Sequence, residues 1–191
     1  MKNLFIHDGR KGDLLKASLH LFAEEGYDKV SVRDIAKRAG VSEAALYKHF
    51  KSKEEMALHI FSLIIAYYTG VLKDIDKNGA GAVNKLCRIV EATYDLYREY
   101  PAEIRLALLS QYLFWDMVGE EIKTHFIMRR IIEAGMEQGE IPRKEVYLWL
   151  SLFSGLMLQP LLQYPYFHDV FPEFELLKKE VGEAARKLKE K

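Results

Sequence analysis

The segment "SEAALYKHFKSKEEM" at residues 42–56 places several phosphate-binding side chains close together. Tyr47, Lys48 and His49 are followed by Lys51 and Lys53. Phenol and ammonium groups donate hydrogen bonds to the phosphate oxygens of a polyanion. From residue 29 to residue 53 the chain carries seven basic and two acidic residues, whereas the whole chain has 28 of each sign. This local excess permits a polyanionic partner, although an ordinary solvated surface has the same composition.

Two short helices joined by a glycine turn are predicted to position these side chains. The sequence "SVRD" at 31–34 has the form of a capping box ahead of a helix at 32–39. Gly40 suits a tight turn, and Ser42 can cap a third helix at 43–50. Leu46 and Phe50 lie one turn apart on the inner face of this third helix, which leaves positions 43, 44, 47 and 48 facing outward. Helix, turn, helix is the arrangement in which the second helix enters the major groove of DNA.

A family resemblance makes this motif much more specific. Residues 31–56, "SVRDIAKRAGVSEAALYKHFKSKEEM", resemble the DNA-binding signature of the TetR family of transcriptional regulators. The lead helix "LLKASLHLFAEEGYDKVS" extends the likeness over the first 56 residues, and the remainder is similar only in length and helical pattern. The resemblance implies a homodimer with an N-terminal DNA-binding domain at 1–55. It also implies a ligand-binding and dimerisation domain at 56–191, and a double-stranded DNA operator as partner.

The same resemblance implies a role for each residue of the motif. Base contacts are expected from the start of the second helix and from the start of the third, and phosphate contacts from residues around them. Glu43 departs from the neutral or basic residue expected there, so it either accepts from a cytosine amino group or repels phosphate. For Tyr47 and His49 the alternative is packing beneath the helix. The expected base contacts are Arg33, Glu43, Ala44 and Ala45, and the phosphate contacts are Ser31, Tyr47, His49 and Lys53, with Lys48 suited to either role.

The remaining sequence predicts an all-α fold of about nine helices. Pro and Gly are sparse, and apolar residues recur at spacings of three and four. The expected organisation is a three-helix helix-turn-helix domain followed by a larger helical bundle. Besides the two short helices, we expect helices at 13–25, 52–76, 82–99, 102–115, 118–138, 143–164 and 172–190.

One uncharged stretch needs a separate interpretation. Residues 146–164 contain 19 residues without charge, 13 of them large and apolar or aromatic. That length suffices to cross a bilayer, but two glutamines, Pro160 and the lack of a strongly basic flank favour a helix buried on several sides. We therefore expect no membrane partner. The single cysteine, Cys87, excludes an internal disulfide and suits a cytoplasmic location.

The last two helices are predicted to form a dimer interface. Apolar residues of the final helix recur at steps of 3, 4, 3 and 4, as in a coiled-coil seam. In the preceding helix, small residues one turn apart permit close helix approach. The alternative is that the same faces pack within one chain. The predicted interface residues are Ser151, Gly155, Phe174, Leu177, Val181, Ala184 and Leu188.

Aromatic side chains between residues 94 and 157 are candidates for a ligand pocket, which the resemblance implies. Most such side chains belong to a core, but pockets in helical bundles have the same lining with a few polar groups. The expected ligand is small and apolar or amphipathic. The apolar candidates are Tyr94, Tyr97, Phe114, Trp115, Phe126, Trp149, Phe153 and Met157, and the polar candidates are Gln111, His125 and Gln159.

Catalysis finds little support in the sequence. No nucleophile and base have a recognisable local context, and no glycine-rich phosphate loop follows a strand. Glu121 and His125 share one face of the expected helix at 118–138, but two ligands do not make a metal site, and an ion-paired surface couple is the favoured interpretation. No cofactor or metal is expected. The leading prediction is a ligand-responsive repressor released from a palindromic operator; the alternative is the same fold acting as a constitutive DNA-binding or protein-docking regulator.

Overall fold

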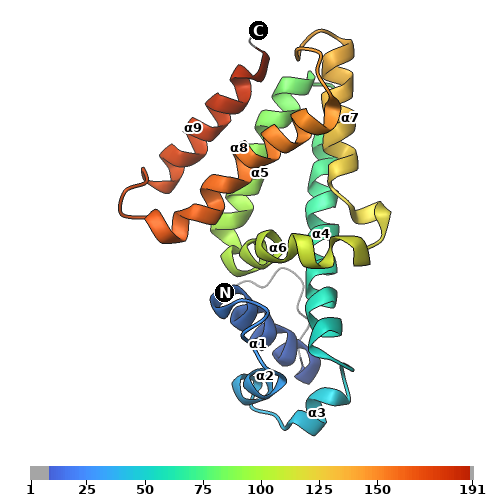
Figure 1. Cartoon of the computed structure of the whole chain (residues 1–191), viewed down its shortest axis with the longest axis vertical. Coiled ribbons are helices and arrows are strands. Elements are labelled where there is room, and N and C mark those ends of the chain that lie inside the picture. The colour runs from blue at the N-terminus through green and yellow to red at the C-terminus, as the bar shows by residue number, and fades with distance from the viewer. Residues whose placement is uncertain (1–8, 190–191) are drawn as a thin grey trace. The chain divides into compact units, whose positions relative to one another are not determined.

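The computed structural model describes residues 9–189, and every regular element among them is a helix (Figure 1). Ser and Gly residues at the helix ends and the 3–4 spacing of apolar residues account for most of the elements. The α-helices are α1 (Arg10–Glu25), α2 (Val32–Ala39), α3 (Glu43–Tyr47), α4 (Lys53–Lys77), α5 (Ala82–Glu99), α6 (Pro101–Phe114), α7 (His125–Glu137), α8 (Val146–Phe167) and α9 (Phe174–Arg186). Three 3-10 helices complete the structure: η1 (Trp115–Met117), η2 (Glu120–Ile122) and η3 (Lys187–Lys189). The all-α prediction is confirmed.

The helices fall into two structural units. The first holds the residues up to Tyr67 together with Glu99–Lys123, and the second holds Tyr68–Arg98 together with the residues from Thr124 onward. The residues of α4 are therefore divided between the two units. The division at residue 55, expected from the likeness of the DNA-binding motif, lies inside the first unit and remains a prediction.

The core of the first unit forms where α1 packs against α2 and α6. Its largest buried side chains include Phe22 of α1, Phe61 of α4 and Phe114 of α6. The ring of Phe114 lies 5.7 Å from that of Phe61. These apolar contacts fix the helices that carry the helix-turn-helix motif.

The second unit is a bundle in which α8 packs against both α7 and α9. Its centre contains Tyr94 and Phe153, each with no exposed surface. Helix α9 is held to α5 by ring contacts and by an ion pair. Phe174 lies 5.7 Å from Tyr94, and the ammonium of Lys178 lies 2.6 Å from the carboxylate of Asp95.

The largest departure from the predicted helices lies between residues 115 and 125. The expected helix at 118–138 is replaced by η1, η2 and a shorter α7 that begins at His125. Gly119 adopts an extended conformation, with φ −62° and ψ 149°, which interrupts the helix. Glu121 and His125 therefore do not share one helix, and the spacing that suggested a pair of metal ligands is lost.

Several other helix ends also differ by one to four residues. Helix α3 ends at Tyr47 rather than at residue 50, α8 continues through Pro165 to Phe167, and α9 begins two residues later than expected. Proline within a helix costs a backbone hydrogen bond but does not always end the helix. By length and composition, α4 and α8 are both long and apolar enough to cross a membrane, and 28% of the apolar window of α8 is buried within the chain.

Candidate nucleic-acid interface

The turn between α2 and α3 depends on Gly40. This residue has φ 68° and ψ 31°, a left-handed conformation that side-chain-bearing residues rarely adopt. Its backbone N–H donates to the carbonyls at the end of α2, and Val41 N–H donates to Ala36 O at 3.0 Å. The turn therefore closes α2 and redirects the chain into α3.

Both helices of the motif begin with a serine cap. The backbone N–H of Asp34 donates to Ser31 Oγ at 3.2 Å, and the N–H of Ser31 donates to Asp34 Oδ2 at 2.9 Å. These hydrogen bonds from Ser31 lower the pKa of the Asp34 carboxyl. Ser42 Oγ accepts from the N–H of Ala45 at 3.2 Å. The predicted capping box and the predicted cap of α3 are therefore confirmed.

Helix α3 is anchored on one side and open on the other. Leu46 is completely buried and Phe50 is 3% exposed, whereas Tyr47 is 52% exposed. His49 is also exposed, so neither Tyr47 nor His49 packs beneath the helix, which was the alternative for both. The predicted DNA-contact residues that are exposed are Ser31, Arg33, Glu43, Ala44, Tyr47, Lys48 and His49, and Ala45 is half-buried.

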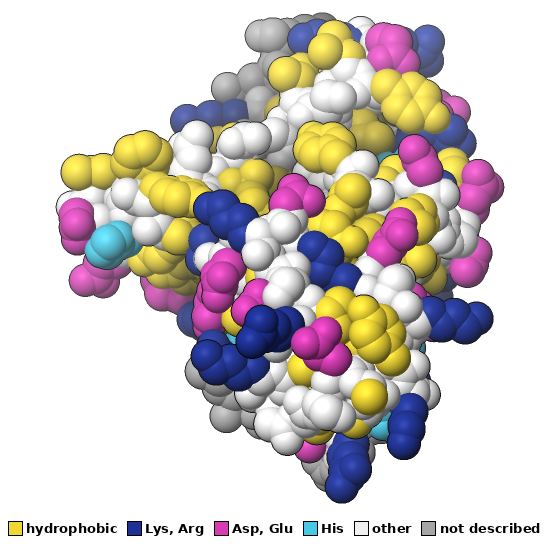
Figure 2. All heavy atoms as spheres, turned by 60° about the horizontal axis from the view of Figure 1, so that its bottom comes forward, with side chains coloured by type: hydrophobic (Ala, Val, Ile, Leu, Met, Phe, Trp, Pro, Cys, Tyr) yellow, Lys and Arg dark blue, Asp and Glu magenta, His cyan; other side chains and the backbone are white. Residues whose placement is uncertain are grey.

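The charge on this face is mixed. Figure 2 brings α1–α3 forward and shows Lys and Arg side chains interspersed with acidic and uncharged ones. One of these acids, Glu24, pairs with Arg38 at 3.8 Å. The surface can therefore bind phosphate at separate points, which suits a duplex whose phosphates are read at defined positions.

Lys53 has a structural role that its sequence position does not indicate. Its ammonium donates to the carbonyl oxygens of Tyr27 at 2.9 Å and Val30 at 3.0 Å. It also lies over the ring of Tyr27, 4.1 Å from the ring centroid. This cation ties the start of α4 to the connection between α1 and α2, and its expected phosphate contact stays a prediction.

The sequence "SKEE" at 52–55 has the form of a capping box for α4, but the box is only half formed. The backbone N–H of Glu55 donates to Ser52 Oγ at 3.0 Å, as expected. The carboxylate of Glu55, however, accepts from the N–H of Lys51 at 2.6 Å rather than from Ser52. Glu55 therefore binds the backbone N–H of the residue before the cap, whereas in a regular capping box it would bind the N–H of the cap residue itself.

The candidate pocket residues are divided between the two units. In the first unit Phe114 is buried, and Gln111 and Trp115 are half-buried. In the second unit the interior candidates are Tyr94, Tyr97, Trp149, Phe153 and Met157, and His125 and Phe126 are half-buried. Gln159 is exposed in the single chain, and its expected polar contribution to the pocket stays a prediction.

Polar groups that the sequence did not single out lie inside the second unit. The hydroxyls of Tyr68 and Thr93 are 2.6 Å apart, and Thr93 also donates to the carbonyl of Ile89 at 2.6 Å. The hydroxyl of Tyr94 donates to the carbonyl of Met157 at 3.3 Å. Burial raises the pKa of Tyr68 to about 12, so its phenol remains neutral and able to donate. In the sequence, Thr93 on the apolar face of α5 could have indicated this cluster of buried hydroxyls.

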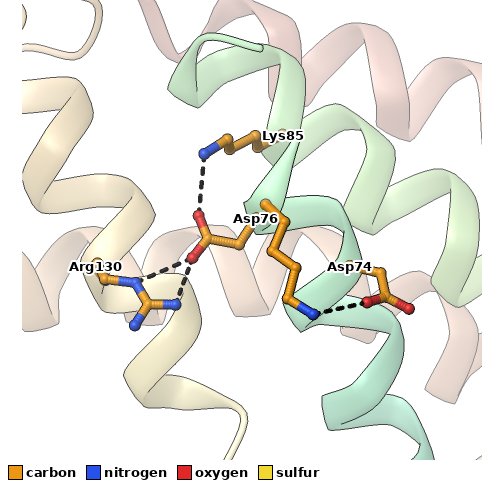
Figure 3. Close-up of polar contacts among 5 residues, drawn as sticks. Asp74, Asp76, Lys85 and Arg130 are labelled. Carbon is orange, nitrogen blue, oxygen red and sulfur yellow. Dashed lines mark hydrogen bonds and ion pairs between the residues drawn. The ribbon is translucent and has the colours of Figure 1, made fainter. Parts of the chain in front are cut away.

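A carboxylate joins three helices of the second unit (Figure 3). Asp76 of α4 accepts from Lys85 of α5 at 3.0 Å and from Nε of Arg130 of α7 at 3.0 Å. Burial raises the pKa of the Asp76 carboxyl, but the hydrogen bonds and charges of Arg130 and Lys85 outweigh it and leave the pKa lowered. The end of α4 is therefore held to α5 and α7 by charge.

The predicted dimer seam lies partly inside the single chain. Leu177 and Val181 are each 6% exposed, and the Sγ–H of Cys87 of α5 donates to the carbonyl of the neighbouring Gly182 at 3.7 Å. Leu177 and Val181 are therefore buried already in the single chain, where α9 packs against α8 and contacts α5, and their place in a dimer seam stays a prediction. Phe174, Ala184 and Leu188 are half-buried, and on α8 Ser151 is exposed and Gly155 half-buried.

A different apolar face is open in the single chain. On α8, Tyr147, Leu148 and Leu152 are 50%, 50% and 49% exposed. Where α8 turns into α9, Phe167 and Val170 are also exposed, and apolar side chains gather at this connection in Figure 2. These exposed side chains, which we call the open α8 face, have the apolar character of an interaction surface.

Comparison with known proteins connects the motif to a family. Residues 14–60 match the sequence model for bacterial regulatory proteins of the tetR family. The chain is 31% identical over 119 residues to the HTH-type transcriptional regulator YerO of Bacillus subtilis, covering 61% of this chain and 40% of that protein. Matches to several such regulators cover only 40% to 55% of their length.

Solved structures share the fold over nearly the whole chain. The transcriptional regulator FadR from Bacillus subtilis, in complex with stearoyl-CoA, matches with a TM-score of 0.71 and 20% identity, covering 92% of this chain and 97% of that one. The ketosteroid transcriptional regulator KstR2 of Mycobacterium tuberculosis matches with a TM-score of 0.72 and 21% identity, covering 94% of each chain. At this identity the likeness establishes the arrangement of helices.

Proposed function

We propose that the chain is a transcriptional repressor of the TetR family that a small amphipathic ligand releases from a palindromic operator. The observation that carries this proposal is the construction of α3. The helix is capped by Ser42 and anchored by Leu46 and Phe50. It presents Ala44, Tyr47 and Lys48 to solvent, where small, phenolic and cationic side chains suit base edges and phosphates. Operator binding requires access to the chromosome, so we place the protein in the cytoplasm.

We further propose a homodimer joined through the open α8 face. Two recognition helices read two half-sites only if a symmetric partner holds the second one, with the half-sites about 34–36 Å apart along the duplex. Leu148 and Leu152 supply apolar surface there, while Ser151 and Gly155 permit close helix approach. An isologous contact between two copies covers the same patch on both chains.

The ligand that we propose is lipid-derived, with a long-chain acyl-CoA thioester as the first candidate. The stearoyl-CoA complex of a protein with the same fold supports this class. The interior of the second unit supports it as well, because large apolar side chains surround a few hydroxyls, those of Tyr68, Thr93 and Tyr94. Apolar walls with a small number of polar groups are the usual lining of a pocket for such a molecule.

The DNA-binding part is tested by selecting duplexes from a random pool and titrating the best sequence at several salt concentrations. We expect a palindromic site, and we expect Lys48→Ala to lower the slope of log K against log salt by about one. The matched control is Lys77→Ala, which removes another exposed lysine, whose side chain is 77% exposed, at the end of α4. Equal effects of the two variants, or no enrichment of any duplex, would contradict the DNA-binding role of α3.

The ligand part is tested by adding stearoyl-CoA to the bound operator complex. Release of the duplex at micromolar stearoyl-CoA, with coenzyme A alone as the control, supports the proposal. A 100-fold change in operator affinity corresponds to about 2.7 kcal/mol of coupling, which is within the usual range for two linked sites. If lipid-derived ligands and other apolar compounds leave the duplex bound, the constitutive alternative replaces the ligand-responsive one.

A further inference from the structure

The ring of Tyr27 contacts three helices of the first unit at once. It lies in the connection between α1 and α2, with its centroid 5.5 Å from the ring of Phe22 of α1. It meets Phe114 at the end of α6 edge to face, at 5.5 Å and an interplanar angle of 87°. The ammonium of Lys53, the first residue of α4, lies 4.1 Å from its centroid. Tyr27 therefore joins α1, the start of α4 and the end of α6.

The groups around this ring leave it little freedom to move alone. Phe114 is 1% exposed and also contacts Phe61 of α4, with ring centroids 5.7 Å apart. Lys53 is fixed from two sides, because its ammonium bonds to the carbonyls of Tyr27 and Val30 while it lies over the ring. If Phe114 moved, Tyr27 would lose its edge contact and could shift, and this shift would change the surroundings of the Lys53 ammonium.

We infer that Tyr27 is a positioning residue that couples the end of α6 to the start of α4 and, through it, to the recognition helix. This inference rests on the proposed DNA-binding function. Only five residues separate Tyr47, the last residue of α3, from Lys53, so movement of the first turn of α4 alters the placement of α3. Energetic coupling between two sites is carried by packed side chains of this kind and acts equally in both directions. DNA binding at α3 therefore changes the environment at the end of α6.

Trp115 is suitably placed to report that change. It directly follows Phe114, and the chain has only two tryptophans, so Trp149→Phe leaves Trp115 as the single fluorophore. The selected operator duplex is titrated into this background and into the same background with Tyr27→Leu. We expect the duplex to change Trp115 emission, and we expect Tyr27→Leu to reduce that change at least threefold at duplex concentrations that saturate both proteins.

Tyr27→Phe is the conservative variant, because it keeps both the face that holds Lys53 and the edge against Phe114. It should retain the full Trp115 response. If Tyr27→Leu acted only by destabilising the fold, DNA binding and the Trp115 signal would fall together. Bound duplex with no Trp115 change in the parent, or an undiminished change in Tyr27→Leu, would overturn the inference.

A second measurement keeps the inference testable without DNA. Amide hydrogen exchange is followed in Phe114→Leu, which removes the ring contact with Tyr27, and in Leu113→Ala, which changes the neighbouring residue, 49% exposed. We expect faster exchange at residues 43–56 in Phe114→Leu only. Equal exchange rates at residues 43–56 in the two variants would refute the coupling. Failure to bind any duplex would instead refute the proposed function, and the exchange measurement would still test the contact between α6 and α4.

Discussion

Replacing Asp76 by Asn should destabilise the protein by about 2–3 kcal/mol. The side chain of Asp76 is 14% exposed and that of its partner Lys85 is 18% exposed, so their hydrogen bond is largely shielded from water. A hydrogen bond to a charged group contributes about 1.5–3 kcal/mol, and loss of the partner also leaves the Lys85 ammonium poorly compensated. The Arg130 side chain is 65% exposed, and its bond adds at most about 1 kcal/mol.

The assay is urea unfolding of the parent and of two variants, Asp76→Asn and Asp74→Asn. Asp74 is the matched control, because it lies two residues away on α4 and pairs with Lys77 at 3.4 Å while its side chain is 78% exposed (Figure 3). We expect this second variant to change the free energy of unfolding by less than about 0.5 kcal/mol. Equal losses in the two variants would show that the cluster around Asp76 does not fasten α4.

The same difference should depend on pH in a defined direction. The folded pKa of Asp76 is lowered, so its stabilising contribution is fully present above the unfolded pKa of about 3.9 and is lost as pH falls through the folded pKa. The parent and Asp76→Asn should therefore differ in unfolding free energy at pH 7 and converge in acid. A difference that stayed constant from pH 7 to below the folded pKa would refute the assigned charge state.

Three further outcomes follow from the contacts. Ser42→Ala should cost about 1 kcal/mol in urea unfolding and weaken operator binding, because Ala45 N–H loses its cap; no change in either would contradict the role of the cap. Lys53→Met should lower stability, because the carbonyls of Tyr27 and Val30 lose their donor, and it should lower the salt slope of DNA binding by about one if the expected phosphate contact forms; an unchanged slope would confine Lys53 to its structural role. Leu152→Asp should sediment as a folded monomer, because Leu152 is 49% exposed in the single chain, whereas Val181→Asp should unfold the chain. A folded dimer of Leu152→Asp would exclude the open α8 face as the dimer interface.

The elements that the sequence predicted best are those whose signals are local. Helix α2 begins and ends at the predicted residues, because Ser31 and Asp34 form a box at one end and Gly40 turns the chain at the other. Helix α5 also spans 82–99 as predicted. Caps and glycine turns act over three or four residues, so they can be recognised without knowing what packs against the helix.

The contacts of the site depend on residues far apart in the chain, and these the sequence could not supply. The carbonyls that hold Lys53 come from residues 26 and 23 positions earlier. A lysine at the start of a helix beside a recognition motif has the same local sequence whether it faces solvent or an inner carbonyl. Its exposure is decided by the path of the chain between α1 and α2.

The interpretation of α8 and α9 shows what apolar spacing can and cannot determine. The 3–4 spacing in α9 correctly identified Leu177 and Val181 as one apolar face, but not that this face is buried already within the single chain. In α8 the lack of charge over residues 146–164 predicted burial on several sides. Within one chain Trp149, Phe153 and Met157 are buried, whereas Leu148 and Leu152 remain half exposed on the opposite side.

This unequal burial is a physical reason to expect a second copy at α8 rather than at α9. In a helix without charges, each apolar side chain that stays in contact with water costs about 25 cal/mol per Å² of exposed apolar surface, relative to burial. Helix α9 buries Leu177 and Val181 inside the chain, and on its exposed side Leu176, which is 46% exposed, accompanies charged residues such as Lys179 and Glu183. Helix α8 leaves one face open, and a symmetric partner that presents the same face covers both copies at once. The dimer axis proposed here therefore passes through α8.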